Sequence, residues 1–416
     1  MHFNLGELFC GPGGMAVAST LVNPIEAMDG EVFSLEHSWG VDYSHCAIET
    51  FKANLGEENG IEMDAAKFVA EGLTPQRRIN ALAFGFPCNS FSSVGESEGL
   101  NNAKFGTLYR TGIQVLERYN PIWFIAENVS GISKIEAGEQ FQTILRDLAN
   151  AGSGYDVVAH LYRFEEYGVP QARHRYVIVG IRHGFARRHR LTFLPPAPTH
   201  GPGRLPFVTV REALANITNQ TEWGGRYARQ SRTVVGRLMF TPPGENAWRL
   251  DEIVKLPDNE LSEYLQRIPW YERDIAPIGD IATIRSEIER VRLHCTKARM
   301  SHIYRRLEAD KPSYTITGSG GGGTHVYHWE EHRALTNEER AALQTFPPNF
   351  RFFGTPEQVR RQIGMAVPTR GAIAIFTAIL QTFARIPYPY VEPDPELVIH
   401  PDNQPARNAQ QGERDD

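Results

Sequence analysis

Residues 85–95 read GFPCNSFSSVG and place a cysteine directly after a proline, at the end of the apolar run 81–84. Pro87 fixes its own φ and offers no amide donor, and the Asn and Ser residues that follow favour irregular backbone. We therefore expect Cys88 where a buried strand ends in a loop, the edge at which α/β folds build their sites. On this segment alone, an inert cysteine buried in the core is the slightly favoured interpretation.

Two further groups could act beside this cysteine. Glu127 comes at the end of the apolar segment 121–126, and an acid there is costly unless it has a partner or a chemical role, such as donating a proton. A helix N-cap or a buried ion pair is the alternative. Arg173 and Arg175 alternate along an extended segment, so we expect both on one side, where they could meet the cysteine and the acid. Two surface arginines are the alternative there.

Another group of residues could hold a nucleotide-like ligand. Residues 9–14, FCGPGG, follow the first expected strand, and glycines allow a tight turn that a ligand can approach closely. Asp42 closes the next strand, where a carboxylate can accept hydrogen bonds from ribose hydroxyls, and Asp64 lies near the end of a third strand. Each feature alone could be a turn or a cap, but together they indicate an adenosine pocket.

The elements that must position these residues alternate along residues 3–180. Apolar runs typical of strands are 5–10, 31–40, 79–86, 121–128, 155–162 and 175–182, and helical periodicity marks 48–55, 111–119 and 142–152. This alternation predicts a parallel α/β sheet with helices on both faces. Further on, Thr336 and Glu339 form a capping box that begins a helix, and residues 371–386 form an apolar closing helix.

Changes in composition predict the domain boundaries. Residues 191–206 are dense in Pro and Gly, and the alternation of strands and helices is lost after them. We expect a catalytic, cofactor-binding α/β domain at 1–190, a smaller domain at 191–305, a return to the first domain over 306–386 and a disordered tail at 387–416.

Charge is distributed unevenly along the 416 residues, whose net charge is −6. Between Arg182 and Arg306 the chain carries 21 Lys and Arg residues against 13 Asp and Glu residues. Such a segment can bind phosphates although the whole protein is acidic. An arginine-rich solvated surface explains the charge equally well.

The pattern of the four cysteines and the lengths of the apolar stretches indicate in which cellular compartment the protein acts. Cys10, Cys46, Cys88 and Cys295 form no CxxC pair, so we expect neither a zinc site nor a disulfide framework. No uninterrupted apolar stretch approaches the length of about 18 residues that a membrane helix needs, and we find no secretory signal. A cytoplasmic protein without membrane contact is the prediction.

Five motifs together resemble those of the cytosine-C5 DNA methyltransferases. FCGPGG, GFPCNSFSSVG, ENV, YGVPQARHR and QIGMAVP occur in the order usual for that family, over roughly residues 5–185 and 305–385. The resemblance implies a Rossmann-like, S-adenosylmethionine-dependent methyltransferase sheet with a smaller target-recognition domain. The implied reaction transfers a methyl group to C5 of a flipped cytosine within a specific short double-stranded DNA sequence, and needs no metal.

The resemblance also assigns roles to the residues of the motifs. Cys88 would be the nucleophile that adds to cytosine C6, Glu127 the acid that bonds N3, and Arg175 the donor to O2. Asn128 and Arg173 would support the loop that carries Cys88.

The residues that the resemblance places against the cofactor are Phe9, Gly11, Gly13, Asp42, Tyr43, Asp64 and Leu108. Asp42 would hold the ribose, Tyr43 would pack on the adenine, and Asp64 would bind the adenine amino group. The basic middle segment lies where the family keeps its target-recognition domain, and its arginines and aromatic residues suit contacts with base edges and phosphates.

Three positions depart from the family's pattern. Asn89 stands in place of the usual Gln, His174 in place of a Glu, and Met365 in place of an Asn. None of these changes removes a catalytic group. A cofactor contact near position 365 would come from the backbone of Ala366 or Val367.

Two other functions stay open at this point: a tRNA cytosine-C5 methyltransferase and a non-catalytic DNA-binding regulator. The long middle segment favours DNA over tRNA, and the intact set Cys88, Glu127 and Arg175 favours catalysis. We further expect a monomer, with a partner restriction endonuclease that cuts the same site.

Overall fold

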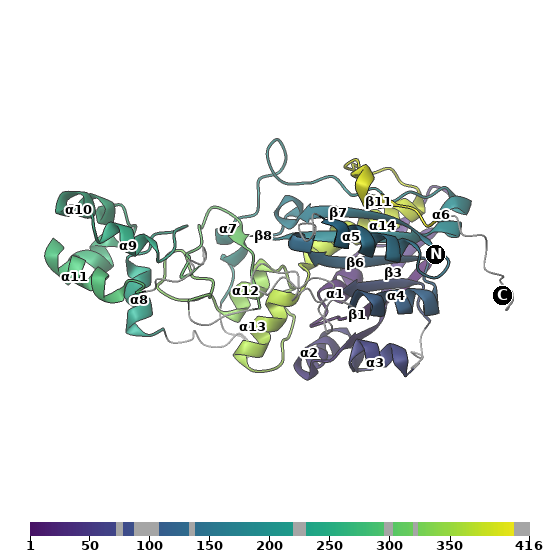
Figure 1. Ribbon diagram of the computed structural model, residues 1–416, viewed down its shortest axis with the longest axis horizontal. Coiled ribbons are helices and arrows are strands. Elements are labelled where there is room, and N and C mark those ends of the chain that lie inside the picture. The colour runs from purple at the N-terminus through teal and green to yellow at the C-terminus, as the bar shows by residue number, and fades with distance from the viewer. Residues whose placement is uncertain are drawn as a thin grey trace.

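A single large sheet lies at one end of the molecule and a group of short helices at the other (Figure 1). The computed structural model describes residues 1–71, 78–86, 108–132, 138–218, 230–294, 303–318 and 323–402. In these residues the sheet has nine strands. In spatial order they are β11 (Val398–Ile399), β7 (Tyr155–Arg163), β9 (His174–Arg182), β6 (Trp123–Val129), β5 (Ala81–Gly85), β1 (His2–Leu8), β3 (Val32–Asp42) and β2 (Ile25–Glu26), with β4 (Gly60–Glu62) paired to β3.

The central strands β5 and β6 are buried on both faces. Ala81 and Ala83 of β5 belong to the core on one face, whereas Leu82 and Phe84 belong to the core on the other. Because side chains alternate along a strand, burial of both faces requires an uninterrupted apolar run. This requirement explains why these strands stand out in the sequence.

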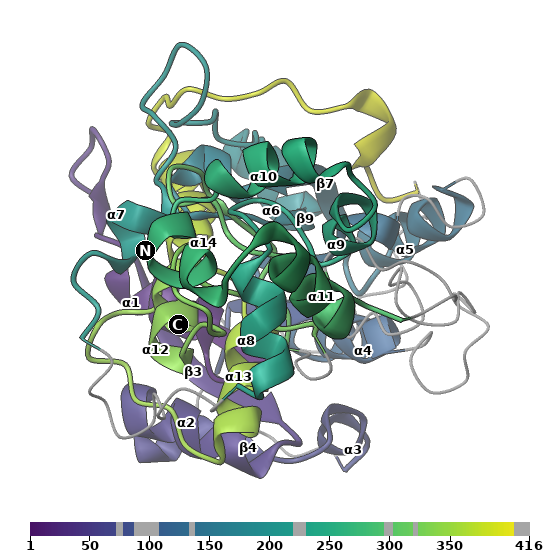
Figure 2. The ribbon, with the colours of Figure 1, turned by 90° about the vertical axis from the view of Figure 1, so that its left-hand side faces the viewer.

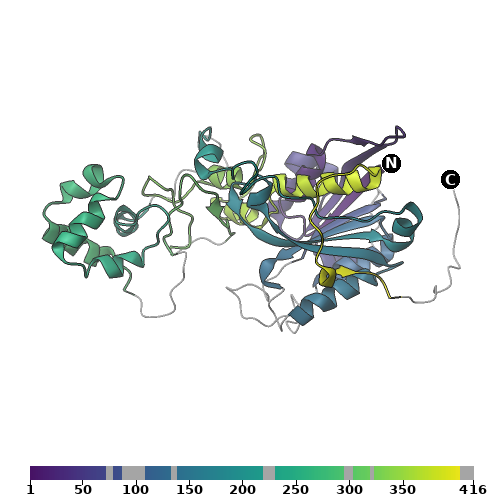
Figure 3. The ribbon, with the colours of Figure 1, turned by 90° about the horizontal axis from the view of Figure 1, so that it is seen from above.

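Helices cover both faces of the sheet, as the alternation predicted. On one face lie α1 (Gly14–Leu21) and α14 (Thr369–Ala384); on the other lie α3 (Ala65–Ala70), α4 (Leu108–Tyr119) and α5 (Glu139–Ala149). Figure 3 shows the yellow helix α14 above the sheet and the blue helices below it. Two further helices, α2 (His45–Leu55) and α6 (His183–His189), follow β3 and β9 directly.

The sheet is mixed, which corrects the expectation of a parallel one. Strands β1, β3, β5 and β6 are parallel, but β9 runs antiparallel to both of its neighbours, β6 and β7. Residues 164–173 join β7 to β9 with only a short 3-10 helix and the two-residue strand β8 (Gln171–Ala172). A parallel return needs a crossover of about a dozen residues or more, so this connection forces an antiparallel strand.

The helices at the far end form a small domain with its own core. They are α8 (Arg232–Met239), α9 (Arg249–Ile253), α10 (Asp258–Gln266) and α11 (Ile281–Val291), and Figure 2 shows them in front of the sheet. Their core also includes Tyr304, Tyr327 and Ala334. The packing of the small domain therefore continues beyond residue 305, the boundary expected from composition.

A buried arginine explains why the chain after residue 305 stays with the small domain. The Arg306 guanidinium donates to the Leu238 carbonyl of α8 and to the carbonyls of His328 and Glu331. It also lies 4.4 Å from the centre of the Trp270 ring. Burial of a charge requires such complete pairing, so this side chain ties the segment 328–331 to α8.

Shorter elements connect the two ends of the molecule. They are α7 (Val210–Leu214), β10 (Ser313–Tyr314), α12 (Asn337–Leu343) and α13 (Pro356–Met365), and Figure 1 shows α7, α12 and α13 between the sheet and the small domain. The expected capping box at Thr336 and Glu339 is confirmed at the start of α12. Strand β10 pairs with β8, so this region is attached directly to the β7–β9 connection.

The expected disordered tail is wrong for residues 387–402, which pack against the sheet domain. Tyr390 bridges to Pro196, and β11 pairs with β7 at the sheet edge. The Asn150 side chain exchanges two hydrogen bonds with Asp402. Although Pro and charged residues are typical of disorder, an unpaired sheet edge provides backbone partners for this segment. Residues 403–416 lie outside the described residues.

Within the part of the chain that the structure describes, one helical stretch is long and apolar enough, by length and composition, to cross a membrane. It covers residues Pro356–Ala384, which include α13 and α14, and 72% of its most apolar window is buried inside the protein. Helix α14 contributes Ile375, Phe376 and Ile379 to the core on one face of the sheet. These contacts are those of a core helix.

Replacement of Gly180 in β9 by alanine should destabilise the fold. A Cβ atom there would lie 2.1 Å from the buried Phe124 ring of the neighbouring strand β6. Overpacking of this kind costs about 1–3 kcal/mol. Urea unfolding should show this loss, whereas Gly184→Ala in α6, where a Cβ meets nothing within 4 Å, should leave stability unchanged or slightly higher. Equal midpoints for the two variants would contradict the close packing of β6 on β9.

Candidate active site

The glycine-rich turn after β1 forms the first part of the site. Phe9, Gly11 and Gly13 have φ of 55°, 54° and 95°, so the chain reverses through left-handed conformations. A Cβ on Gly11 would meet nothing within 4 Å, which leaves open space above the turn. A Cβ on Gly14 would lie 2.6 Å from the Val367 carbonyl oxygen, so the turn packs on the C-terminal part of the chain. A ligand could therefore approach the backbone of this turn closely through the open space at Gly11.

Asp42 at the end of β3 fixes the same turn. Its Oδ2 accepts from the Gly11 amide at 2.9 Å, and its Oδ1 accepts from the Ser44 amide at 2.9 Å. Burial raises the pKa of Asp42, and the amide donors of Ser44, Gly11 and Tyr43 oppose that rise. Each carboxylate oxygen has a second lone pair, so the residue can both orient the turn and accept from a ribose hydroxyl.

The other residues expected at the cofactor lie along the same sheet edge. Tyr43 directly follows β3, and 72% of its surface is exposed, so its ring is free to pack on a base. Asp64 caps α3: its Oδ1 accepts from the amides of Ala66 and Lys67. Leu108 is the first residue of α4. Tyr43 and Asp64 therefore follow the ends of β3 and β4, and Leu108 begins the helix after β5.

Glu127 and Arg175 form an ion pair at the end of β6. Arg175 Nε lies 2.9 Å from Glu127 Oε1, and both side chains are about nine-tenths buried, with 14% and 13% of their surface exposed. A Cβ on Gly85 would lie 3.4 Å from Glu127 Oε2, so this carboxylate lies over the end of β5. Residues 87 and 88 follow there directly in the sequence. Of the two arginines expected near this acid, Arg175 contacts it, and the contact is also the buried ion pair named as the alternative for Glu127.

Asn128 holds the end of β5 from the adjacent strand. Its Nδ2 donates to the Phe86 carbonyl at 3.4 Å, and its Oδ1 accepts from the Val129 amide at 2.8 Å. Phe86 is the last described residue before Cys88, which itself lies outside the described residues together with Asn89. Asn128 thus holds the residue from which the sequence continues to Pro87 and Cys88.

Arg173 departs from the expectation that both arginines face the acid. Its Nη1 donates to the carbonyls of Ile316 and Gly364, both at 3.1 Å, and its side chain is buried. Regular strand structure stops between β8 and β9 at this residue, so the two-residue periodicity that would align it with Arg175 is broken. Burial and the nearby Arg175 lower the pKa of Arg173 to about 9. Its described contacts join the sheet domain to the C-terminal part of the chain.

Gln171 belongs to the same junction, and the sequence reasoning did not single it out. Its Nε2 donates to the Leu343 carbonyl and to Gln344, and its Oε1 accepts from the Ile316 amide. A polar residue next to Arg173 in the extended segment was the available signal. The junction fixes β10 and the end of α12 against β8, the short strand that precedes β9 with Arg175.

A buried acid and histidine lie directly under the glycine-rich turn and were also missed. Glu7 Oε2 is 3.4 Å from His37 Nε2, and both side chains are only 2% exposed. Burial raises the pKa of Glu7 well above its usual range and lowers the pKa of His37 to about 3. Since burial pushes both groups toward their neutral forms, we regard this as a neutral contact. An acid inside the first apolar strand was the signal that could have found it.

Cys10 in the glycine-rich turn does not fit the role of a nucleophile. Its thiol is buried, and burial raises its pKa well above the usual range, with the Asp42 and Glu7 carboxyl groups adding to the rise. The thiolate is the reactive form of cysteine, so a thiol that stays protonated is inert.

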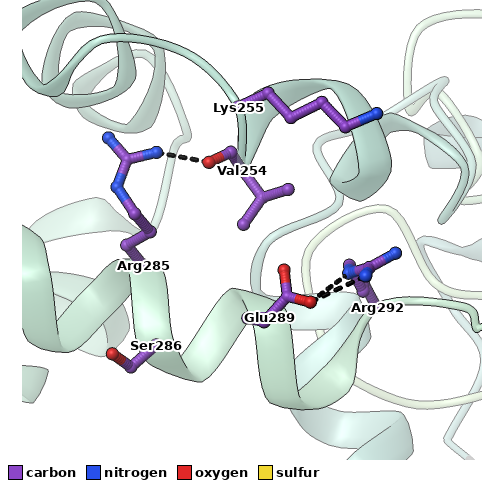
Figure 4. Close-up of a pocket in the computed structure, with 6 residues that line it drawn as sticks. All are labelled: Val254, Lys255, Arg285, Ser286, Glu289 and Arg292. Atoms are coloured by element: carbon purple, nitrogen blue, oxygen red, sulfur yellow. Dashed lines mark hydrogen bonds and ion pairs between the residues drawn. The ribbon is translucent and has the colours of Figure 1, made fainter.

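In the small domain, several arginines contact the domain itself. Arg237 donates to the Val291 carbonyl, Arg292 pairs with Asp251 and Glu289, and Arg285 donates to the Val254 carbonyl and pairs with Asp258. Figure 4 shows Arg285, Arg292 and Glu289 around a hollow of about 450 Å³, which Val254, Lys255 and Ser286 also line.

Because of these internal contacts, fewer arginines of the middle segment are available to bind phosphate than its basic composition indicated. From the sequence, the aromatic residues of this segment suit contacts with base edges, but two of them, Trp248 and Trp270, belong to the core of the small domain. The hollow in Figure 4 lies between α11 and the residues directly after α9, in the part of the molecule opposite the sheet (Figure 1). A cation that already has an acidic partner contributes less to phosphate binding than a free one.

Comparisons with known proteins agree with this geometry. A family model described as C-5 cytosine-specific DNA methylase matches residues 3–381. The chain is 44% identical over 396 residues to the type II methyltransferase M.BbvI of Brevibacillus brevis, with 94% of each chain covered. It is 35% identical to the type II methyltransferase M.NgoFVII of Neisseria gonorrhoeae, over 84% of this chain and 82% of that one.

A solved structure gives the same result for the fold. The Dnmt2 methyltransferase of S. pombe superposes with a TM-score of 0.52 and 15% identity, over 92% of this chain and 98% of that chain. The expectation of an α/β methyltransferase sheet is therefore confirmed.

The buried histidine predicts a specific pH dependence of stability. Burial lowers the pKa of His37 from its usual 6.5 to about 3, so between these pH values the unfolded chain binds up to one more proton than the folded protein. As pH falls through this window, the folded state loses up to about 1.4 kcal/mol per pH unit from this residue. Urea unfolding from about pH 7 to about pH 5 should show a steeper loss for the wild type than for His37→Leu.

His45→Leu is the matched control for this measurement. Its exposed ring bonds Glu62, which raises the pKa of His45, so the stability from this pair is present at low pH and lost as pH rises. Its removal should therefore change the slope in the opposite direction. Parallel pH curves for the wild type and His37→Leu would show that His37 is not held neutral.

Proposed function

The chain belongs to the C-5 cytosine-specific DNA methylase family and methylates DNA cytosine at C5 with S-adenosylmethionine, and we propose that Cys88 is its nucleophile. One observation carries this assignment. The Glu127 carboxylate, held by Arg175, lies over Gly85, three residues before Cys88 in the sequence. A cytosine that bonds Glu127 would therefore lie next to the end of β5, from which the Cys88 segment departs.

The proposed chemistry requires a thiolate, an acid and a hydrogen-bond donor. Cytosine C5 is a poor nucleophile, but addition of the Cys88 thiolate to C6 creates an enamine whose C5 can attack an electrophilic methyl group. Glu127 protonates or bonds N3, and Arg175 donates to O2, so both stabilise the charge that develops on the ring. Water then takes the C5 proton, the C6–S bond breaks with its electron pair returning to sulfur, and N3 gives back to Glu127 any proton it received, so that the methylated base and the Cys88 thiolate are released.

The cofactor residues follow from the glycine-rich turn. S-adenosylmethionine supplies a methyl sulfonium group, which is the electrophile of the reaction. We assign its binding to Phe9, Gly11, Gly13, Asp42, Tyr43, Asp64 and Leu108. The open space above Gly11 and the exposed ring of Tyr43 support this assignment. Asp42 would receive the ribose with the lone pairs that its two backbone donors leave free.

Asn128 and Arg173 are proposed as positioning residues. Asn128 acts on the Cys88 segment through the Phe86 carbonyl. Arg173 acts through Ile316 and Gly364, because these contacts fix the C-terminal part of the chain beside the strand that carries Arg175.

The target is proposed to be a cytosine flipped out of a specific short sequence in double-stranded DNA. A base inside a duplex cannot reach a residue such as Glu127, so the enzyme must extrude it, at a cost of a few kcal/mol. We assign recognition to the smaller domain, residues 191–305 with the segment that shares its core. Its separate core and its place opposite the sheet support this division, with residues 1–190 and 306–386 as the catalytic part.

The relatives support a further proposal about biological context. The relatives from Brevibacillus brevis and Neisseria gonorrhoeae both carry the name type II methyltransferase. We propose that this chain acts as a cytoplasmic monomer beside a restriction endonuclease that cuts the same DNA sequence. The tRNA-methylating and non-catalytic alternatives have no comparable observation in their favour.

Methylation mapping tests the nucleophile. A methylation-deficient host that expresses the wild-type chain should carry methylated cytosines at one short recurrent sequence, and Cys88→Ala should abolish them because no thiolate can add to C6. Cys46→Ala, which removes a different thiol, should methylate normally. Cofactor binding by purified Cys88→Ala controls for folding. Retained methylation in Cys88→Ala would exclude the assignment, and unmodified DNA with the wild type would redirect the test to tRNA.

Exchange of the small domain tests its role in recognition. Residues 207–300 replaced by the corresponding segment of a relative with a different target should move methylation to the relative's sequence, because the catalytic residues all lie outside this segment. The readout is the same methylation map, with cofactor affinity as the control for folding. An active chimera that still methylates the original sequence would place recognition elsewhere in the chain.

A further inference from the structure

Three side chains from distant parts of the sequence meet at the sheet edge opposite the candidate active site. They are Asp156 in β7, His183 at the start of α6 and His400 directly after β11. The strand register pairs Tyr155 with Arg182 at this edge and Arg163 with His174 at the other, beside Arg175. Figure 1 shows α6 and β11 on the side of the sheet away from the small domain.

The three groups point their ligand atoms at a common point. His183 Nδ1 is 2.7 Å from Asp156 Oδ1, and His400 Nδ1 is 2.6 Å from the same oxygen. All three atoms lie within 4.8 Å of one another. One carboxylate oxygen therefore accepts from two imidazole rings, although neither histidine is close to the other in sequence.

We propose that Asp156, His183 and His400 bind a divalent transition-metal ion, with Zn²⁺ as the chemical type. Two imidazole nitrogens and one carboxylate oxygen are a usual ligand set for zinc, with water in the fourth tetrahedral position. Imidazole ligands also suit Co²⁺ and Ni²⁺, whereas Mg²⁺ and Ca²⁺ prefer oxygen alone. Nothing in the proposed methyl transfer uses this site.

A metal ion requires only a small adjustment of these side chains. Bonds of about 2.0–2.1 Å in a tetrahedral site separate neighbouring ligand atoms by roughly 3.3 Å, so the rings must withdraw by a fraction of an ångström. The His400 side chain is 66% exposed and can move outward, whereas Asp156 and His183 are 22% and 28% exposed. Each ring then carries its proton on Nε2, and the ion replaces the two hydrogen bonds to the carboxylate.

The ion would fix the C-terminal segment to the sheet. Strand β11 has only two residues. Val398 and Ile399 pack, partly buried, against the cores of the sheet domain, and Gln142 donates to the Glu396 carbonyl. A ligand from β7, one from α6 and one from the C-terminal segment would join three elements at one point. Because metal binds only this folded arrangement, its binding free energy adds to the stability of the edge.

The test uses the untagged full-length chain and Co²⁺ as a spectroscopic probe. One equivalent should bind and give the visible absorption of tetrahedral Co²⁺ with nitrogen and oxygen ligands, without the charge-transfer band that thiolate ligands produce. Zn²⁺ should displace it. Asp156→Asn and His400→Gln should weaken binding by at least about tenfold, and Zn²⁺ should raise the Tm of the wild type but not of these variants.

His2→Ala is the matched control, because His2 also pairs with a carboxylate, Glu36 at 3.0 Å, but without a second imidazole. It should bind Co²⁺ like the wild type. Equal affinity in the wild type, Asp156→Asn and His400→Gln, or a thiolate spectrum, would overturn the proposal. If the wild type bound no Co²⁺, the proposal would also be wrong, and the three side chains would be joined only by the hydrogen bonds of His183 and His400 with Asp156.

Discussion

Burial of the central strands on both faces is the constraint on which the rest of this structure depends. Strands β5 and β6 carry apolar residues to both cores, so polar chemistry can start only where they end. Glu127 and Asn128 come at that point of β6, directly beside the end of β5. The sheet thereby places an acid, an amide and the departure point of the Cys88 segment within reach of one another.

A second set of contacts, centred on Arg173, holds the part of the chain that follows the small domain against this edge of the sheet. Arg173 donates to Ile316 and Gly364, and a Cβ on Gly364 would lie 2.1 Å from the Gly318 amide nitrogen. A buried guanidinium is stable only with such partners, and the backbone approach requires glycine. Through Val367, which packs on Gly14, the same C-terminal segment also supports the cofactor turn.

The small domain shows why composition is a poor guide to a binding surface. Its net basic charge suggested phosphate contacts, yet Arg292 pairs with two acids of the domain and Arg306 is buried among carbonyl groups. Trp270, available for base contacts by composition, instead packs under Arg306. Several of its arginines already have partners within the domain, so fewer of them can bind phosphate than a count of Lys and Arg suggests.

The sequence by itself determined the strand and helix alternation, the glycine turn, the capping box at Thr336 and the family, because these depend on local periodicity and motif order. Tertiary structure alone decided that β9 runs antiparallel, that Arg173 turns away from Glu127, and that residues 387–402 cover a sheet edge. These outcomes depend on which partner a group finds across long sequence distances. A local sequence pattern identifies such a residue, but it does not show which distant residue will contact it.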